Sequence, residues 1–323
     1  MDHKIITLLA SVALFNPGNA VAQDYPVRPI RLVVPFPAGG NTDIMARMLA
    51  LQVGPQFGES MVIDNRAGAD GIIGAQIVAS AVPDGYTLLH NSAALVINQN
   101  IYRKLPYDLK RDLTPITTYA QGVGYLLLVS ASSPAQTINE LVALAKSREK
   151  PMSYGSAGIG NTTHLLAALF TLNAKIDPVH VPYKGLAPAM TALMGGEVQF
   201  AFSAPPAALP FLKSGKMRVL AFTGQSRWPS LPEVPTIAES GIPHFDIGGG
   251  WFAWFVQART PPAIIAKLHS QIVRALKAPE FVSYLRSGGY EPDGRSPEEA
   301  RKFVHAEIDR YGEAVKAAKI PMQ

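Results

Sequence analysis

YGSAGIGNTTHLLAALF, residues 154–170, contains a strand, a glycine-rich turn, an Asn-Thr pair and a helix in that order. The stretch PFPAGGNTDIMARML, residues 35–49, repeats this order, with Asn41-Thr42 where the first stretch has Asn161-Thr162. In open parallel sheets, loops that follow strands in this way are the places where ligands bind. The two stretches therefore predict an α/β fold with two related loops.

The chemistry of these two loops favours a small anion. Asn and Thr are preferred helix N-caps, and glycine lets the backbone turn tightly and approach a ligand closely. The first N–H groups of each helix have no intrahelical partner, and together with the helix dipole they form an anion site that needs no cation. The residues leave a second interpretation open, in which both stretches are ordinary capped loops.

Residues 155–162 nearly match the phosphate-binding P-loop, but Asn161 stands at the position of its lysine. A triphosphate would lose its main charge partner there. A single carboxylate does not need that lysine, because backbone N–H groups and the hydroxyls of Ser156, Thr162 or Thr42 can bind it. The sequence therefore favours a carboxylate site over a nucleotide site.

Ser156 also raises the alternative of an enzyme. Residues 154–158 approach the G-x-S-x-G nucleophile elbow, but Tyr154 replaces the first glycine and no second motif places a His/Asp pair. A secreted serine hydrolase built on Ser156 is therefore the minor alternative. We interpret His164 as a packing or capping residue. We expect Asp43 to stabilise the start of its helix, or to meet the ammonium group if the ligand is an amino acid.

The remaining chain alternates between strands and helices. The expected strands are 30–35, 61–64, 86–90, 125–130, 152–154, 179–182, 198–202, 218–223 and 251–257. The expected helices are 42–53, 71–81, 138–147, 163–173, 187–194, 261–277, 279–286 and 297–318. We expect Trp251 and Trp254, in the last of these strands, to lie in the core.

This rhythm restarts near residue 123, and an apolar strand follows residue 245. The pattern predicts two lobes with parallel sheets, joined by two chain crossings that form a hinge. We expect lobe I at residues 23–122 plus 246–323 and lobe II at residues 123–245. A cleft between two such lobes is a favoured place for a ligand.

Composition limits the class of protein. Residues 1–22 have the pattern of a signal peptide, with an A-x-A cleavage site at Ala20-Val21-Ala22, which predicts a periplasmic or extracellular protein. The chain has no cysteine, and therefore no disulfide framework and no thiolate metal site. His90, His180 and His244 lack metal-ligand spacing. The net charge of +5 comes from scattered basic residues, unlike the one-sided clusters of nucleic-acid-binding proteins.

A resemblance to a known family now adds to these inferences. VPFPAGGNTDIMAR, residues 34–47, resembles the opening signature of the Bug family, the periplasmic solute-binding proteins of tripartite tricarboxylate transporters. Similar motifs follow in order: DGYTLL (84–89), YGSAGIGNTTHL (154–165), VPYKGLAPAMTALMGGEV (181–198), SGKMRVLAFTGQSR (214–227), LPEVPTIAESGIP (231–243) and RTPPAIIAKL (259–268). The resemblance covers essentially the whole mature chain.

The resemblance implies a two-lobe, type II-like Venus-flytrap binding protein with no catalytic activity, cofactor or metal. Backbone amides of the two loops would bind one carboxylate of the ligand, at residues 36–42 and 156–163. The ligand-binding residues so implied are Phe36, Ala38, Gly39, Gly40, Asn41, Thr42, Ser92, Ser156, Ala157, Gly160, Asn161, Thr162, Thr163 and Ser203. Many family members have Asp or Asn in place of Ser203, so a less polar far end of the ligand is compatible with this chain.

The same resemblance implies a small carboxylate ligand: a dicarboxylate, an acidic amino acid or an aromatic acid. It also implies delivery of this ligand to an integral membrane permease. A receptor that presents the ligand to a sensor kinase is the alternative role. We expect a monomer.

Overall fold

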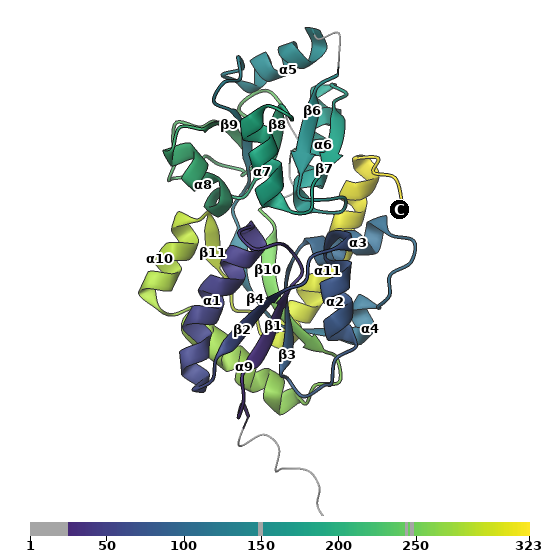
Figure 1. Cartoon of the computed structure of the whole chain (residues 1–323), viewed down its shortest axis with the longest axis vertical. Coiled ribbons are helices and arrows are strands. Elements are labelled where there is room, and N and C mark those ends of the chain that lie inside the picture. The colour runs from purple at the N-terminus through teal and green to yellow at the C-terminus, as the bar shows by residue number, and fades with distance from the viewer. Residues whose placement is uncertain (1–24, 148–150, 243–244, 246–248) are drawn as a thin grey trace, which may run out of the picture.

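Two lobes, each built around its own β-sheet, make up the protein (Figure 1). The computed structural model describes residues 25–147, 151–242, 245 and 249–323. We call the part of the chain that carries the six-stranded sheet lobe one and the part that carries the five-stranded sheet lobe two. The predicted signal peptide lies outside the described residues.

The sheet of lobe one has six strands and mixed direction. In spatial order they are β11 (Tyr290–Pro292), β4 (Leu113–Gly122), β10 (Trp251–Gln257), β3 (Thr87–Ser92), β1 (Ile30–Val34) and β2 (Met61–Asn65). The β1 strand pairs in parallel with β2 and β3, whereas β10 runs antiparallel to both β3 and β4. The parallel part carries the first glycine-rich loop, which follows β1.

The sheet of lobe two has five strands and is also mixed. In spatial order they are β7 (Val179–Pro182), β6 (Ser153–Ser156), β8 (Phe200–Ser203), β5 (Leu126–Ser130) and β9 (Met217–Phe222). The β6 strand pairs in parallel with β7 and β8, and β5 is antiparallel to β8 and β9. The second glycine-rich loop follows β6.

Helices cover both sheets. Those of lobe one are α1 (Asn41–Phe57), the 3-10 helix η1 (Ala69–Gly71), α2 (Ile72–Ala79), α3 (Ala94–Ile101), α4 (Leu109–Asp112), α9 (Pro262–Ala275), α10 (Pro279–Ser287) and α11 (Pro297–Ala317). Those of lobe two are α5 (Ile138–Ser147), α6 (Thr162–Ala174), α7 (Leu186–Gly195) and α8 (Pro205–Lys213). In the described part of the chain, no helix combines the length and apolar character that crossing a membrane requires.

The structure corrects several expectations. The prediction of parallel sheets is wrong for β4, β5, β9, β10 and β11, all of which pair antiparallel. The elements α3, α4, α8, β4 and β11 were not predicted. Trp251 and Trp254 do lie in the core, with exposed fractions of 2% and 0%. The proposed lobe limits, 122/123 and 245/246, fall between the last strand of one sheet and the first strand of the other.

The two connections between the lobes touch at a pair of glycines. A Cβ atom placed on Gly122 would overlap the carbonyl group of Gly249, and a Cβ on Gly249 would overlap that of Gly122 in the same way. The Gly122 N–H also donates to the carbonyl of Gly250 at 2.9 Å. The connections therefore pack backbone to backbone, and only glycine leaves room for this.

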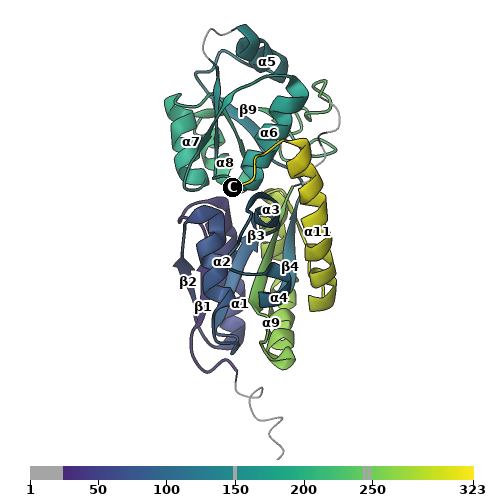
Figure 2. The same cartoon turned by 90° about the vertical axis from the view of Figure 1, so that its right-hand side faces the viewer.

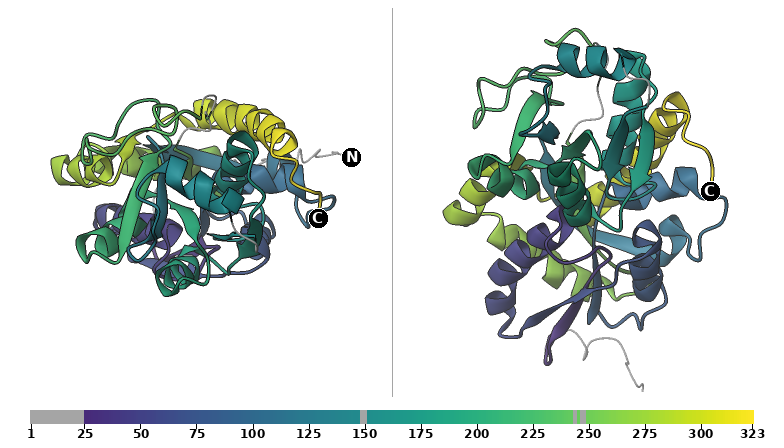
Figure 3. Two further views of the ribbon diagram at one scale, coloured as in Figure 1. Left: turned by 90° about the horizontal axis from the view of Figure 1, so that it is seen from above. Right: turned by 45° about the horizontal axis from the view of Figure 1, so that its top comes forward.

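The long helix α11 lies along lobe one, and its C-terminal end reaches α6 of lobe two (Figure 2). The same yellow helix lies beside the blue α3 in both views of Figure 3. A complete capping box holds its start, because Ser296 and Glu299 each bond the other's backbone N–H. The lobes are thus in contact through α11 as well as through the two connections.

Candidate functional site

The two glycine-rich loops face each other across the space between the lobes. Loop one joins β1 to α1, and loop two joins β6 to α6, so both lie at the carboxyl ends of parallel strands. Between them is a small cavity with a water-accessible volume of about 40 Å³. It is lined by Phe36, Pro37, Gly40, Asn41, Thr42, Ser92, Tyr125, Ala157, Asn161, Thr162, Thr163, Leu186, Ala187, Ala204 and Phe252.

Loop one enters its helix without a side-chain cap. Gly40 is the N-cap residue, and no side chain bonds the first turn from that position. The backbone N–H groups of Asn41 and Thr42 have no hydrogen-bond partner among the described residues. Both residues line the cavity, so loop one offers unpaired donors at the positive end of a helix dipole.

Asp43 places a carboxylate in the first turn of the same helix. It accepts hydrogen bonds from the Gly39 N–H at 3.0 Å, from Arg47 at 2.9 Å and from Asn65 at 2.9 Å. Burial would raise its pKa, but these hydrogen bonds and the charge of Arg47 hold the pKa of Asp43 below its usual value. Asp43 therefore stays ionised and bound to its own lobe, as expected of a residue that stabilises a helix start.

Loop two is held by its own side chains. Asn161 is the N-cap, and its side-chain oxygen accepts from the Thr163 N–H at 3.0 Å. The Thr163 hydroxyl accepts from the Ala157 N–H at 2.9 Å, and the Ser156 hydroxyl accepts from the Gly158 N–H at 3.2 Å. The N–H of Thr162 has no partner among the described residues and lies at the cavity.

Most of the predicted ligand-binding residues line this cavity. They are Phe36, Gly40, Asn41, Thr42, Ser92, Ala157, Asn161, Thr162 and Thr163. Ala38, Gly39, Ser156, Gly160 and Ser203 do not line it. The loops therefore supply a shared wall, although not every residue of each loop contributes to it.

Ala38, outside the wall, is exposed, whereas Gly39, Gly160 and Ser203 have identifiable partners. The Gly39 N–H is bound to Asp43, as described above. Gly160 faces Asn98 of α3, and a Cβ atom on Gly160 would lie 2.5 Å from the Asn98 side-chain oxygen. Ser203 is fully buried, and its hydroxyl donates to the carbonyl of Ala204 at 3.0 Å. The wall at this point is formed by Ala204 instead, so the hydroxyl of Ser203 does not reach the cavity.

Ser156 has a histidine neighbour that the sequence did not reveal. Its hydroxyl lies 2.6 Å from Nε2 of His180, and the His180 ring stacks on His164 with centroids 4.0 Å apart. Burial lowers the pKa of His164 to about 4, and burial together with His164 lowers the pKa of His180 to about 3. Ser156 is fully buried and does not line the cavity, so this pair does not present a nucleophile to a ligand.

The cavity wall also contains residues that local sequence patterns missed: Pro37, Tyr125, Leu186, Ala187, Ala204 and Phe252. Tyr125 and Phe252 lie at the starts of apolar runs, which predict strands and nothing more. Burial raises the pKa of Tyr125 to about 12, with a hydrogen bond to Thr162 opposing the shift. Phe252 stacks on His90, whose pKa burial lowers to about 3. Both Tyr125 and His90 are neutral at pH 7.

Asn41 connects the cavity to the far edge of the sheet of lobe one. Its side-chain nitrogen donates to the hydroxyl of Tyr290 in β11 at 2.8 Å, and its side-chain oxygen is buried without a partner among the described residues. A buried unpaired polar atom is costly and is commonly satisfied by water or a ligand. Among the described residues that line the cavity, none carries a charged side chain. The wall thus offers neutral donors and no charged side chain.

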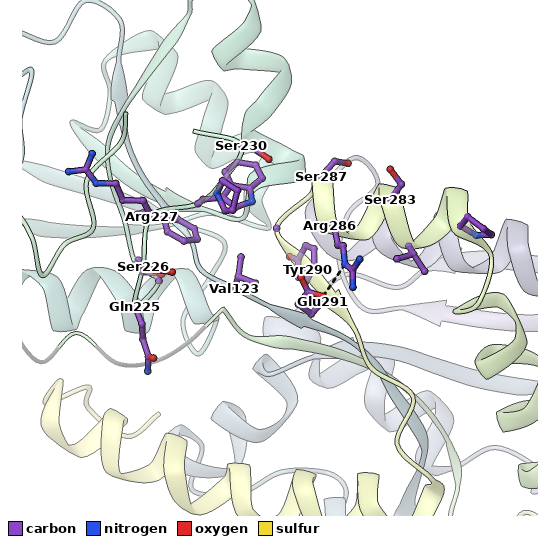
Figure 4. A pocket seen from close by; sticks show the side chains of 18 residues that line it. Val123, Gln225, Ser226, Arg227, Ser230, Ser283, Arg286, Ser287, Tyr290 and Glu291 are labelled. Carbon is purple, nitrogen blue, oxygen red and sulfur yellow. Dashed lines mark hydrogen bonds and ion pairs between the residues drawn. The ribbon is translucent and has the colours of Figure 1, made fainter. Parts of the chain in front are cut away.

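A larger cavity, of about 1050 Å³, lies beside the connections between the lobes (Figure 4). In Figure 4, Arg227 comes from lobe two and Arg286 from α10 of lobe one. Arg227 pairs with Glu239 at 3.0 Å, and Arg286 pairs with Glu291 at 3.1 Å. No residue of the two glycine-rich loops lines this cavity, so it is separate from the candidate site.

Two α/β lobes, two connections and a polar cavity between paired loops define the class of the protein: it has the two-lobe fold of periplasmic binding proteins. The solved structures to which this chain is similar include the following three. "R. palustris Rpa4515 with adipate" is 36% identical, with a TM-score of 0.88, over 93% of this chain and 100% of that chain. "Structure of periplasmic binding protein BugD" is 32% identical, with a TM-score of 0.88 and the same coverage. MatC (Rpa3494) from Rhodopseudomonas palustris with bound malate is 31% identical, with a TM-score of 0.83, over 90% and 100%.

The sequence model described as "Tripartite tricarboxylate transporter family receptor" matches residues 45–320. The chain belongs to this family. Its members, which include the Bug proteins, are periplasmic substrate-binding receptors and not enzymes, so the hydrolase alternative built on Ser156 is set aside. The resemblance to the Bug family and the expected two-lobe fold are thus both confirmed.

Proposed function

We propose that this chain is a periplasmic solute-binding protein that captures a small carboxylate between lobe I (residues 23–122 and 246–323) and lobe II (residues 123–245). The observation that carries the proposal is the pair of unpaired amides in loop one, at Asn41 and Thr42, opposite the Thr162 amide of loop two. Two helix N-termini then face one site, and each favours negative charge. The relatives solved with adipate and malate support a carboxylate as the ligand.

The electrostatics of the site agree with this proposal. A carboxylate can be bound by several N–H groups at once, and charge-assisted hydrogen bonds are roughly twice as strong as neutral ones. The neutral wall places no cation or anion beside the bound group. Asp43, the acidic side chain that follows loop one, is already satisfied by Gly39, Arg47 and Asn65. The helix termini are therefore free to act on a ligand.

Proline at the first position of α1 offers a direct test. Proline is tolerated at this position, but it removes the backbone N–H. We expect Asn41→Pro to bind carboxylates at least about 10-fold more weakly than Asn41→Ala, because both lose the side chain and only the first loses the amide. Isothermal titration of protein unfolded, dialysed and refolded to remove bound ligand would measure this difference. Circular dichroism would show that both variants fold.

Two results would contradict the proposal. The first is that the wild-type protein binds none of a panel of aliphatic dicarboxylates, acidic amino acids and aromatic acids. This result would contradict a carboxylate as the ligand. Equal affinities for Asn41→Pro and Asn41→Ala would show that the amide of loop one does not contact the ligand.

Delivery to a tripartite-type membrane permease is the role that we propose after capture. It follows from membership of a family of transporter receptors. We expect cells that lack the gene to lose uptake of the labelled acid that the purified protein binds, and to regain it when the gene is restored. Unchanged uptake, together with a lost transcriptional response to the acid, would favour presentation to a sensor kinase.

A further inference from the structure

A second cavity adjoins the candidate site. It has a volume of about 340 Å³, and it shares Phe36, Pro37 and Ala157 with the small cavity between the loops. Its remaining wall comes mainly from residues 67–71 of lobe one and residues 182–185 of lobe two. Because both lobes contribute, this space is complete only when the lobes lie together as they do here. A ligand longer than one carboxylate group needs space beyond the small cavity, and this second cavity is next to it.

Asp70 and Lys184 are the only charged residues among the described residues that line this second cavity. Asp70 is already engaged. One of its oxygens accepts from the Tyr102 hydroxyl at 2.7 Å, and the other faces the Cα of Gly158 in loop two. Burial raises the pKa of Asp70, with the hydrogen bond from Tyr102 opposing the shift. Asp70 thus belongs to the contact between the lobes rather than to an open binding surface.

Lys184 is different, because its ammonium group has no hydrogen bond or ion pair with any described residue. Its backbone is nevertheless fixed on both sides. The N–H of Tyr183 donates to the carbonyl of Ser156 at 3.0 Å. Gly185, at φ 117°, is the N-cap of α7, and a Cβ atom there would lie 2.9 Å from Pro37 of lobe one. The loop therefore holds an unmatched positive charge at the edge of the second cavity.

We propose that the second cavity receives the second carboxylate of a dicarboxylate and that Lys184 selects this dianion over a monocarboxylate of the same length. The inference rests on the proposed function, because the first carboxylate must occupy the cavity between the loops. The first cavity has no charged side chain and little space, whereas the second has both space and a cation. Lys184 is exposed, so its contribution is modest and screened by salt.

The experiment compares acids in pairs. Titration calorimetry measures wild type and Lys184→Gln with aliphatic α,ω-dicarboxylates of about four to eight carbon atoms and with the monocarboxylates of equal length. At the chain length that binds most tightly, we expect the wild type to bind the dicarboxylate more tightly than the monocarboxylate. Lys184→Gln should bind that dicarboxylate about 5-fold more weakly than the wild type does. Binding of the monocarboxylate should change little. Lys184→Arg should keep the preference, because it keeps the charge.

Lys146→Gln provides the matched control. It removes the same charge from the last turn of α5, on the same lobe but away from both cavities. A ratio of dicarboxylate to monocarboxylate affinity that is equal in wild type and Lys184→Gln would overturn this inference and leave the proposed function intact. Loss of the preference in Lys146→Gln to the same extent would also overturn it. Failure of wild type to bind any acid would remove both proposals.

Discussion

Loop one and loop two look alike in sequence, yet the structure supports them in opposite ways. Asn161 caps α6 with its side chain, whereas Asn41 lies one position later, inside the first turn of α1, behind a glycine cap. Loop two is therefore stabilised from within, by Asn161, Thr163 and Ser156. Loop one is held partly by Asp43, which accepts from the Gly39 N–H, and partly from a distant element, because the Asn41 side chain bonds Tyr290, 249 residues further along the chain.

The third residue of each helix sharpens the contrast. In α1 it is Asp43, an ionised carboxylate that the helix dipole favours. In α6 it is His164, a buried and neutral ring. One loop thus keeps a fixed negative charge beside its free amides, while the other would gain a positive charge only at low pH. The matching sequence patterns correctly indicate that both loops follow strands. They do not indicate which hydrogen bonds stabilise each loop.

The largest effect is expected at Gly160. Gly160→Val should weaken carboxylate binding by about 100-fold or more, because the added side chain would meet Asn98 of the opposite lobe at a backbone φ of 82°. Gly40→Val should also abolish binding, but through the cavity, since Gly40 lines it. Gly160→Ala and Gly40→Ala help to separate these two causes, which are contact with Asn98 and filling of the cavity. Gly40→Ala, at φ −77° with no Cβ contact nearer than 3.5 Å, should remain well folded.

The valine and alanine variants at both glycines can be compared by titration and by urea denaturation. Normal binding by Gly160→Val would show that contact between Gly160 and Asn98 is not needed when the ligand is held. Normal binding by Gly40→Val would show that the wall of loop one is purely structural.

A smaller effect is expected at Asn161. Asn161→Asp keeps a good N-cap, so its free energy of unfolding should stay close to that of wild type, but carboxylate affinity should fall about 10-fold because a negative charge enters the wall. Asn161→Ala should lower the free energy of unfolding more than it lowers the affinity for a carboxylate. Loss of the cap costs roughly 1 kcal/mol of stability, with less effect on affinity. Equal affinities for Asn161→Asp and wild type would place the bound charge away from loop two.

The last effect concerns the pH dependence of stability rather than ligand affinity, and it comes from His164 in the first turn of α6. The pKa of His164 is lowered to about 4 in the folded protein, whereas in the unfolded chain it is about 6.5. The unfolded chain therefore binds the proton first, and the free energy of unfolding falls as the pH drops from about 6.5 towards 4. His164→Leu should remove about 2 kcal/mol of the difference in the free energy of unfolding between pH 7 and pH 5. Urea denaturation at both pH values would measure it, and an unchanged difference would contradict the burial of a neutral His164.

Much of the fold follows from local patterns. Strands β1, β5 and β10 are short apolar runs, and the helices α5, α6 and α11 lie close to their predicted limits. The strand β4 was not predicted, and it contains Pro115, a residue type that argues against a strand. In the sheet, Pro115 pairs with Phe255 next to a shift in register, where a proline is tolerated. The helix α8 was not predicted either, and Pro205 and Pro206 occupy its first turn, where proline is accepted.

The candidate site divides in the same way. Residues that share a loop with an Asn-Thr pair could be predicted, because a strand, a turn and a helix cap are local features. Tyr125, Leu186 and Phe252 could not, because they reach the cavity from elements that only the tertiary fold brings together. The polar link from Asn41 to Tyr290 and the contact of Ser156 with His180 also depend on long-range pairing. Local periodicity carries no information about such partners.

The contact between Gly122 and Gly249 has a mechanical consequence. Two ribbons that touch without side chains, and that share the hydrogen bond from Gly122 to Gly250, cannot slide past each other without breaking that bond. Any relative movement of the lobes that keeps this bond therefore has to leave the two ribbons in register at Gly122.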